Sequence, residues 1–390
     1  MLKHLLFVCI LFIPSQVGAQ SKKFWNKGSA ELTEAVEKLP FHYQNDLPFV
    51  EVKIKGKIYN FLFDSGAPTV ISNAIYNELG LKSSFESEVG DSQKSVQKQI
   101  FTVLPELSLG NIAFKNISAV VVDLTSPEFK CLQVDGILGS NQMALLYWKL
   151  NYLENSMLAS KDLQSLINDD TFSKIPFKSN KQKTPFIKSK IENKDISMEL
   201  DTGYNGKLQI NSSEFAIEKN VSKDRYLISS GINSIGLYGP ANVKDEYIFK
   251  INKFSLAELE LENKIFDTGD LNLIGNKFLK DYEFILDWKK NNLYLKPIQQ
   301  SETGYKSFGF SYRFIKNKAV VSSIIKDKNI PLEMNDEILS INSVSLENLD
   351  NEQSCNYYLN SVEKNLSKIT VVIKRGEAIK TFDVEKITYF

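Results

Sequence analysis

Histidine is almost absent from this sequence of 390 residues, which contains only His4 and His42. A His-Glu-x-x-His zinc site needs two histidines, and Ser-His-Asp or Cys-His catalysis needs one beside its nucleophile. His4 lies in an N-terminal stretch that we expect to be removed, and we interpret His42 as a surface or strand-entry residue. We therefore predict no metal site, and any hydrolytic chemistry in this chain would rely on carboxylates.

The sequence also has few cysteines and no formal net charge. The chain has three cysteines, of which Cys9 lies in the same N-terminal stretch, and it has 47 basic side chains against 47 acidic ones. We place Cys131 and Cys355 in different domains and expect both to be free thiols, so that no disulfide holds the chain together. The balanced charge indicates neither nucleic acid nor an anionic membrane as a partner.

The N-terminus has the pattern of a secretory signal peptide over residues 1–19. Lys3 and His4 precede an apolar run at residues 5–13, and Val-Gly-Ala at 17–19 supplies the small residue of a cleavage site. The alternative, a membrane anchor, is disfavoured because the run is too short to span a bilayer. The sequence therefore predicts export to a periplasm or out of the cell, with no stable membrane anchor after cleavage.

Residues 59–70, Tyr-Asn-Phe-Leu-Phe-Asp-Ser-Gly-Ala-Pro-Thr-Val, combine a strand pattern with an acidic end. Phe61 and Phe63 alternate with a smaller side chain, which suits a strand with one face in a core. The strand then runs into Asp64-Ser-Gly. A carboxylate at a buried strand end is costly to desolvate unless donors surround it, and a glycine two positions on lets the backbone turn tightly and offer its N–H. The arrangement favours a chemically active acid over a structural one.

The same design recurs 137 positions later, where residues 196–208 contain Asp201-Thr-Gly after an apolar run. Each copy is followed by an aliphatic-aliphatic-Gly element, whose glycine lies 75 positions after Asp64 and 74 positions after Asp201. A third Asp-Thr-Gly begins at Asp267, but it lacks a preceding apolar strand and has no counterpart in the first copy, so we exclude it from the repeat. The ordered set of elements therefore occurs twice within residues 45–297.

This duplication resembles the aspartic protease clan, specifically the retropepsin-like and pepsin-like enzymes built from two Asp-[Ser/Thr]-Gly lobes. The resemblance implies a mainly β, bilobal fold with homologous lobes at residues 20–160 and 161–300, in which Asp64 and Asp201 form a catalytic dyad. It implies no metal and no organic cofactor. It also implies four supporting residues. The hydroxyls of Ser65 and Thr202 would hold the two active-site loops together, and the N–H groups of Gly66 and Gly203 would reach the carboxylates.

Several other elements follow from local patterns. Residues 29–39 place apolar side chains on one side of a predicted amphipathic helix. Ser72 is positioned to cap a short helix that ends at Gly80. Residues 83–104 form a predicted hairpin over the cleft, in the place of the family's flap, with a turn signal at residues 89–91.

The residues that follow the two Asp-[Ser/Thr]-Gly motifs differ from those of the pepsin-like branch. In that branch a Ser or Thr is often found there, and its hydroxyl hydrogen-bonds the catalytic carboxylate. Here Ala67 and Tyr204 occupy these positions, so the dyad lacks a group that stabilises its ionised form. This predicts raised pKa values and an activity optimum in the mildly acidic to neutral range, as in the retroviral branch.

From residue 301 the pattern changes, and no third Asp-x-Gly lobe follows. Residues 335–342, Asn-Asp-Glu-Ile-Leu-Ser-Ile-Asn, together with a predicted helix at 352–361 and predicted strands at 368–374 and 379–384, resemble a PDZ domain over residues 301–390. In this resemblance Phe308, Gly309 and Phe310 form the loop whose N–H groups hold a peptide's terminal carboxylate. An alternative remains open, in which a PDZ fold serves only as a packed lid on the protease.

The two resemblances imply an exported aspartic endopeptidase. It would hydrolyse a peptide or protein substrate with a water activated by the Asp64 and Asp201 dyad, and its PDZ domain would bind a substrate or a partner's C-terminal peptide. The alternative is a non-catalytic exported peptide-binding protein that retains the aspartic protease fold. An inert relative would most simply have lost one of the two aspartates, and both are present.

Overall fold

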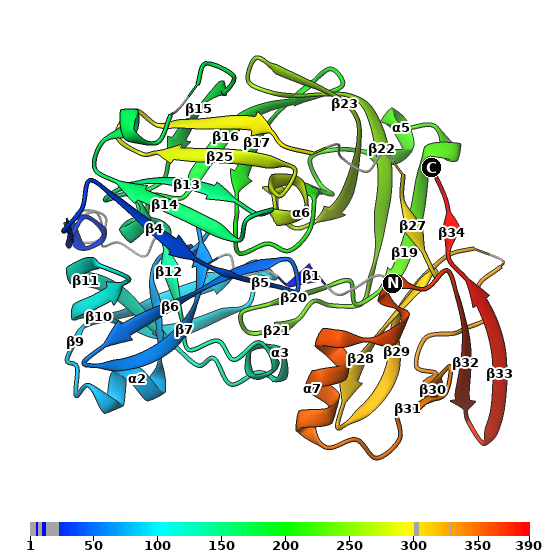
Figure 1. Cartoon of the computed structure of the whole chain (residues 1–390). Helices are drawn as coiled ribbons and strands as arrows, with labels where there is room; N and C mark the ends of the chain where they lie inside the picture. The colour runs from blue at the N-terminus through cyan, green and yellow to red at the C-terminus, as the bar shows by residue number, and fades with distance from the viewer. Residues whose placement is uncertain (1–4, 7–9, 13–22, 168, 300–303, 328) are drawn as a thin grey trace.

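We describe the fold from a computed structural model that covers residues 5–6, 10–12, 23–167, 169–299, 304–327 and 329–390. Strands dominate and helices are short, which confirms the prediction of a mainly β fold (Figure 1). One group of strands surrounds Asp64 and a second surrounds Asp201. A sheet shared by both groups lies between them, and a further group of strands follows at the C-terminus.

The strands around Asp64 come from the first part of the chain. They are β6 (Leu47–Ile54), β7 (Lys57–Asp64), β8 (Val70–Ser72), β9 (Ser83–Asp91), β10 (Val96–Leu109), β11 (Ile112–Val122) and β12 (Gly136–Gly139). Strand β7 pairs antiparallel with β6 and parallel with β12, while β8 pairs antiparallel with β12 and parallel with β11. The hairpins β10–β11 and β9–β10 extend the sheet.

The strands around Asp201 repeat this order. They are β16 (Pro185–Ile191), β17 (Lys194–Leu200), β18 (Leu208–Asn211), β19 (Tyr226–Gly231), β22 (Lys244–Leu256), β23 (Leu259–Gly269) and β24 (Leu273–Ile274). Strand β17 pairs antiparallel with β16 and parallel with β24, while β18 pairs antiparallel with β24 and parallel with β23. The hairpins β22–β23 and β19–β22 complete the set. The pairing pattern of the first group therefore recurs strand for strand.

Short helices follow several of these strands. They are α2 (Asn73–Glu78), α3 (Pro127–Cys131), α4 (Ser140–Met143), η1 (Leu163–Ser165), α5 (Ile217–Asn220), η2 (Lys223–Arg225) and α6 (Asn276–Leu279). Helices α2 and α5 follow corresponding strands in the two groups, as do α4 and α6, which each begin directly after the glycine of an aliphatic-aliphatic-Gly element. Ser72 caps α2 by accepting the Ile75 N–H, and Gly80 takes a positive φ of 58° after it, which confirms the predicted start and end of this helix.

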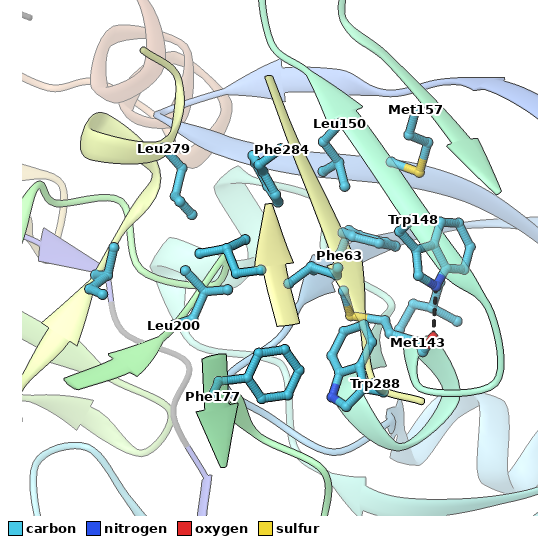
Figure 2. Close-up of a cluster of buried hydrophobic side chains, with 14 of the residues drawn as sticks. Phe63, Met143, Trp148, Leu150, Met157, Phe177, Leu200, Leu279, Phe284 and Trp288 are labelled. Carbon is cyan, nitrogen blue, oxygen red and sulfur yellow. Dashed lines mark hydrogen bonds between the residues drawn. The ribbon is translucent and has the colours of Figure 1, made fainter. Parts of the chain in front are cut away.

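A six-stranded antiparallel run joins the two groups. In order of pairing its strands are β4 (Val36–Pro40), β14 (Ser156–Ser160), β13 (Tyr147–Asn151), β25 (Tyr282–Asp287), β26 (Asn292–Pro297) and β15 (Ser173–Ser179). Trp148 and Phe284 of this sheet lie in one buried cluster with Phe63 and Leu200, the residues directly before the two aspartates (Figure 2). One hydrophobic core therefore supports the ends of both β7 and β17.

The C-terminal group packs around its own buried cluster. Its elements are β27 (Lys306–Ser307), β28 (Phe310–Ile315), β29 (Lys318–Ile325), β30 (Glu337–Ile341), β31 (Val344–Ser345), α7 (Asn351–Asn360), η3 (Val362–Asn365), β32 (Lys368–Arg375), β33 (Ala378–Glu385) and β34 (Ile387–Thr388). The helix and two strands predicted in this part of the chain are present as α7, β32 and β33. Strand β29 also pairs with β19, so the sheet continues from the second group into the C-terminal one.

The remaining strands are short. Near the N-terminus they are β1 (Leu5–Leu6), β2 (Ile10–Phe12), β3 (Ser29–Leu32) and β5 (His42–Gln44). The loop between β19 and β22 contains β20 (Ser234–Gly236) and β21 (Gly239–Pro240). Most of the predicted signal peptide lies outside the described residues. The part that is described pairs β1 with β20 and β2 with β9.

Three expectations about local structure are wrong. Residues 29–39 are two strands instead of an amphipathic helix, because β3 finds a partner in β11 and β4 finds one in β14. Residues 89–91 belong to β9, and the chain turns at residues 92–95 instead. Asp267 does follow a strand, since it lies in β23 after the buried Ile265 and Phe266.

The expectation of free cysteines is also wrong. Cys131 of α3 and Cys355 of α7 form a disulfide across 224 positions of sequence. The two helices pack against each other, so residues placed in different domains still bring their sulfur atoms together. Assignment to separate domains therefore gave no ground for excluding a bond between them.

Candidate active site

Strand β7 carries Asp64 to a fully buried position. Phe61 and Phe63 point into the core shared with the six-stranded run, while Leu62 belongs to a second cluster on the other face. At the strand end Asp64 Oδ1 accepts the Gly66 N–H at 2.7 Å and the Ala67 N–H at 3.1 Å. The tight turn therefore solvates one oxygen of a carboxylate that has no exposed surface.

Asp201 is held in the corresponding way at the end of β17. It is fully buried, and its Oδ1 accepts the Gly203 N–H at 2.8 Å. The Oδ2 atoms of Asp64 and Asp201 accept no hydrogen bond from any donor group of the described residues. Each of the two carboxylates therefore keeps one oxygen that no donor of the described residues occupies.

The two loops exchange hydrogen bonds in a reciprocal pattern. The Ser65 N–H donates to Thr202 Oγ1 at 2.9 Å, and the Thr202 N–H donates to Ser65 Oγ at 3.1 Å. Each hydroxyl then donates across to the opposite strand, from Ser65 to the Leu200 carbonyl at 2.6 Å and from Thr202 to the Phe63 carbonyl at 2.7 Å. Four buried hydrogen bonds thus fix the relative position of the two Asp-bearing strand ends.

The glycines of the two motifs allow this close approach. A Cβ atom on Gly66 would lie 2.6 Å from the Asp201 carboxyl carbon, and one on Gly203 would collide with the Asp64 carboxylate. Any side chain at either position would therefore displace the carboxylate of the opposite loop. The same contacts show that each carboxylate lies against the opposite loop's glycine, so the structure brings Asp64, Gly66, Asp201 and Gly203 together.

Burial and mutual proximity shift the titration of both acids. Desolvation, followed by the charge of Asp201, raises the pKa of Asp64 well above its usual value. Desolvation raises the pKa of Asp201 to about 6, opposed by the hydrogen bond from the Gly203 N–H. Two carboxylates in such a site do not both ionise at low cost, so the pair retains one proton over a range of pH in which isolated aspartates are charged.

Polar residues that the sequence analysis did not single out support the two loops. Asn276 Nδ2 donates to the Thr202 carbonyl at 2.6 Å, and Ser140 Oγ donates to the Ala67 carbonyl at 3.1 Å. Asn141 Oδ1 accepts both the N–H and the hydroxyl of Thr69. A signal for them exists in the sequence, because these buried polar residues directly follow the two aliphatic-aliphatic-Gly elements.

The third Asp-Thr-Gly lies elsewhere. Asp267 sits within β23, opposite Gln209 of β18, and Thr268 Oγ1 accepts the Tyr247 N–H at 2.8 Å. Burial raises the pKa of Asp267 to about 6, partly offset by Lys277 and Lys207. No second Asp-[Ser/Thr]-Gly loop faces it among the described residues, so Asp267 lacks the paired geometry of Asp64 and Asp201.

The loop predicted to hold a peptide's carboxylate is occupied by intramolecular contacts. Phe308 and Phe310 are fully buried in the C-terminal cluster. The Gly309 N–H donates to Ser307 Oγ at 2.9 Å, and the Gly309 carbonyl accepts the Ile325 N–H at 2.7 Å. The Gly309 amide is therefore already satisfied within the chain.

Within the described part of the chain, no group of three or more His, Cys, Asp or Glu residues is arranged to hold a metal ion. In the same residues, no helix is both long enough and apolar enough to cross a membrane. The groups described at the site are the two carboxylates and the N–H donors around them.

Comparison with known proteins agrees with this chemistry. Residues 50–142 match the model of a family described as aspartyl protease. The match spans β6 to α4 and so includes Asp64 and its loop, while Asp201 lies beyond it. No curated protein sequence matches the chain. The family match supports an aspartic protease, and therefore a hydrolase.

Proposed function

We propose that this protein is an exported, single-chain, bilobal aspartic endopeptidase whose dyad is Asp64 and Asp201. The observation that carries the proposal is the reciprocal arrangement of the two loops. Two buried carboxylates lie at the ends of equivalent strands, each against the opposite loop's glycine, and the loops are joined by the paired hydrogen bonds of Ser65 and Thr202. The two lobes would correspond to residues 20–160 and 161–300.

The mechanism follows from the shared proton. One carboxylate of the dyad is ionised and removes a proton from a water molecule, whose oxygen attacks the carbonyl carbon of the scissile peptide bond. The protonated partner donates its hydrogen bond, and then its proton, to the carbonyl oxygen. As the tetrahedral intermediate collapses and the C–N bond breaks, the carboxyl group that took the water proton gives it to the leaving amine. The other carboxylate takes back a proton from a hydroxyl of the intermediate, so the dyad returns to its singly protonated state.

For the C-terminal domain, residues 301–390, we propose a PDZ-type fold that acts mainly as a clamp on the two lobes. Strand β29 pairs with β19 of the second lobe, and the Cys131–Cys355 disulfide joins α7 to α3 of the first. Arg313 of β28 also pairs with Glu128 of α3 at 2.6 Å, with both side chains largely buried. These contacts, together with the occupied Gly309 amide, favour a packed domain over an open peptide receptor.

Export is supported by the same disulfide. Disulfides persist in oxidising compartments such as the periplasm or the extracellular space and are rare in a reducing cytosol. A signal peptide at residues 1–19 would deliver the chain there. A peptide or protein substrate and no cofactor complete the proposal.

The test is substitution of each aspartate. We expect Asp64→Asn and Asp201→Asn each to lower peptide hydrolysis by roughly 10²- to 10⁴-fold, because each removes either the acid or the base of the dyad. Circular dichroism and melting temperature should show that both variants fold. Asp267→Asn is the matched control, a partly buried aspartate in the same tripeptide, and should keep near wild-type activity.

The outcomes separate this proposal from a non-catalytic peptide-binding protein. Loss of activity in the Asp267 variant with retention in the Asp201 variant would show that Asp267, and not Asp201, is the second catalytic aspartate. A pure wild-type protein that cleaves no peptide, yet is stabilised by a pepstatin-like transition-state mimic, would favour the binding protein instead.

A further inference from the structure

The tip of the β9–β10 hairpin contacts the loop between β19 and β22 through one buried carboxylate. Asp91 has no exposed surface, and its Oδ1 accepts the Gln93 and Ser95 N–H groups at 3.0 Å, which shapes the hairpin's own turn. Its other oxygen, Oδ2, accepts the Tyr238 N–H at 2.9 Å. A single side chain therefore both folds one hairpin and binds the loop of the other strand group.

Further polar contacts join the same two segments. Gln99 of β10 donates from Nε2 to the Tyr238 hydroxyl at 3.1 Å. Lys94, in the hairpin turn, pairs at 2.9 Å with Asp270, which follows β23 and also pairs with Lys244 at 2.7 Å. The hairpin tip is thus bound to the second strand group at three points.

The hairpin tip and the loop pack closely at Gly236. A Cβ atom on Gly236 would lie 2.5 Å from Asp91 Oδ2 and 2.7 Å from Gln93 Cγ. The φ of Gly236 is not positive, so its backbone conformation does not require glycine. Glycine at this position is therefore explained by the close approach of the Asp91 carboxylate.

An apolar cluster connects this contact to the active site. Ile235 and Leu237, on the loop of the second group, are buried together with Val89 and Phe101 of the hairpin and with Ala67. Ala67 is the residue whose N–H donates to Asp64. Separation of the hairpin from the loop would therefore expose apolar surface and remove packing from the Asp64 turn.

Extended backbone already lies along both segments. Strand β2 pairs antiparallel with the end of β9, with Ile10 opposite Asp91, and β1 pairs parallel with β20. The contact between Asp91 and Tyr238 is formed while these two pairings are in place. The edges of β9 and β20 can therefore each pair with an extended chain while the hairpin and the loop are in contact.

We propose that Asp91 is a positioning residue that latches the β9–β10 hairpin to the loop at residues 232–239 and so holds the cleft closed over an extended substrate. The inference rests on the proposed protease function, which it deepens. To open, the hairpin must break a charge-assisted hydrogen bond to a buried carboxylate and expose the cluster that contains Ile235 and Leu237. The latch acts on substrate retention and leaves the proton transfers to Asp64 and Asp201.

The test uses Asp91→Asn in the mature full-length protein. The asparagine oxygen retains the bonds from Gln93 and Ser95, whereas its amide group faces the Tyr238 N–H and cannot accept from it. We expect kcat/KM on a short peptide to fall by roughly 10- to 100-fold, the range for loss of one hydrogen bond to a charged group, with most of the loss in KM.

Two companion variants sharpen the result. Gly236→Ala keeps Asp91 but inserts a methyl group into the contact, so it should raise KM in the same way even if Asp91→Asn folds poorly. Asp123→Asn is the matched control, because Asp123 is an exposed aspartate that accepts the Thr125 N–H within its own loop. It should leave both kcat and KM unchanged.

Hydrogen exchange gives a readout that needs no catalysis. In Asp91→Asn and in Gly236→Ala the amides of residues 235–239 should lose protection, while those of β7 and β17 keep it. Unchanged exchange at residues 235–239, or a fall in kcat at constant KM, would overturn the latch. A wild-type protein without peptidase activity whose Asp91 variant still loses this protection would overturn the protease proposal and leave the latch intact.

Discussion

At the scale of single residues, the active-site geometry depends on small groups. Gly66 and Gly203 are fixed by the carboxylates that lie against them, and the hydroxyls of Ser65 and Thr202 each make one bond as donor and one as acceptor. The motif Asp-[Ser/Thr]-Gly thus contains a carboxylate, a cross-linking hydroxyl and a residue without a side chain. Each of these is required by the opposite loop, which explains why the pattern occurs twice.

The residue after each motif affects the pKa values of the two catalytic carboxyl groups. Ala67 offers only its N–H to Asp64, and the ring of Tyr204 packs against Gly206 and Gly275 instead of reaching a carboxylate. No hydroxyl at either position stabilises the ionised dyad, and both pKa values are raised. Activity requires one proton on the pair. It falls at low pH when the base becomes protonated and at high pH when the shared proton is lost, so raised pKa values move the whole profile to higher pH.

We therefore expect kcat/KM on a short uncharged peptide to peak in the mildly acidic to neutral range. Ala67→Ser should move the upper limb of the pH profile toward acid by roughly 0.5 to 1 unit, because one added hydrogen bond stabilises the ionised form. The same substitution at Ala113, which lies in β11 and outside both active-site loops, should leave the pH profile unchanged. An optimum at strongly acidic pH, or an upper limb that Ala67→Ser does not move, would contradict this account.

At the scale of elements, local sequence patterns predicted the parts whose partners are close in sequence. The buried strand before Asp64 and the capped helix after Ser72 were predicted because strand alternation and a capping residue each act over a few positions. The hairpin of β9 and β10 was also predicted, but its turn lies at residues 92–95 instead of 89–91. The paired loops were predicted because the duplication repeats a motif. The bonds between the loops span 137 positions and followed from the family resemblance rather than from the pattern itself.

Elements stabilised by distant partners were mispredicted or missed. Residues 29–39 have apolar side chains at helical spacing, but β4 becomes a strand because β14, more than 100 positions later, offers it an edge. The disulfide between α3 and α7 was missed for the same reason, since local patterns do not show that two cysteines 224 positions apart in the sequence come together. The latch at Asp91 likewise depends on a distant partner, since Tyr238 lies 147 positions later in the sequence.

The disulfide gives a prediction at this scale. It closes a long loop between α3 and α7, and closure of such a loop restricts the unfolded chain. We expect the double variant Cys131→Ser, Cys355→Ser to lose about 2–4 kcal/mol of unfolding free energy, measured by urea denaturation. The variant should remain folded, because the Arg313 to Glu128 ion pair and the β19–β29 pairing still join the same parts.

A thiol count provides the check on this prediction. The mature protein, denatured without reductant, should show no reactive thiol, and reduction should release the thiols of Cys131 and Cys355. Reactive thiols before reduction would show that the bond does not form in the exported protein. An unfolding free energy that is the same in the double variant and the wild type would show that the bond adds no stability.

At the scale of the whole molecule, the C-terminal domain bridges the two strand groups beside the latch. It reaches the first group through α3 and α7, and the second through β19 and β29. Ile235 of the latch loop lines a cavity of about 280 Å³ together with Phe314 and Tyr358 of the C-terminal domain. The Ile232 N–H of the same loop donates to the Ser322 carbonyl of β29 at 2.8 Å, so the loop that holds Tyr238 contacts this domain directly.

These contacts lead to the prediction for removal of residues 301–390. Both Asp-bearing groups are complete before residue 301, but deletion would expose the edge of β19 and split a buried cluster that contains Ile248, Ile265 and Ile325. An exposed strand edge and newly exposed apolar surface favour aggregation and loosen the latch loop. We expect the truncated protein to melt at a lower temperature than the full chain and to lose activity equally on a short unstructured peptide and on a protein substrate with a free C-terminus.

The comparison of the two substrates decides between the roles of the domain, since a clamp affects the cleft for every substrate, whereas a peptide receptor affects only substrates that it recruits. Loss confined to the protein substrate would establish a recruiting PDZ groove, and full activity on both would mean that the domain is an independent tether and that its contacts with β19 and α3 do not support the cleft.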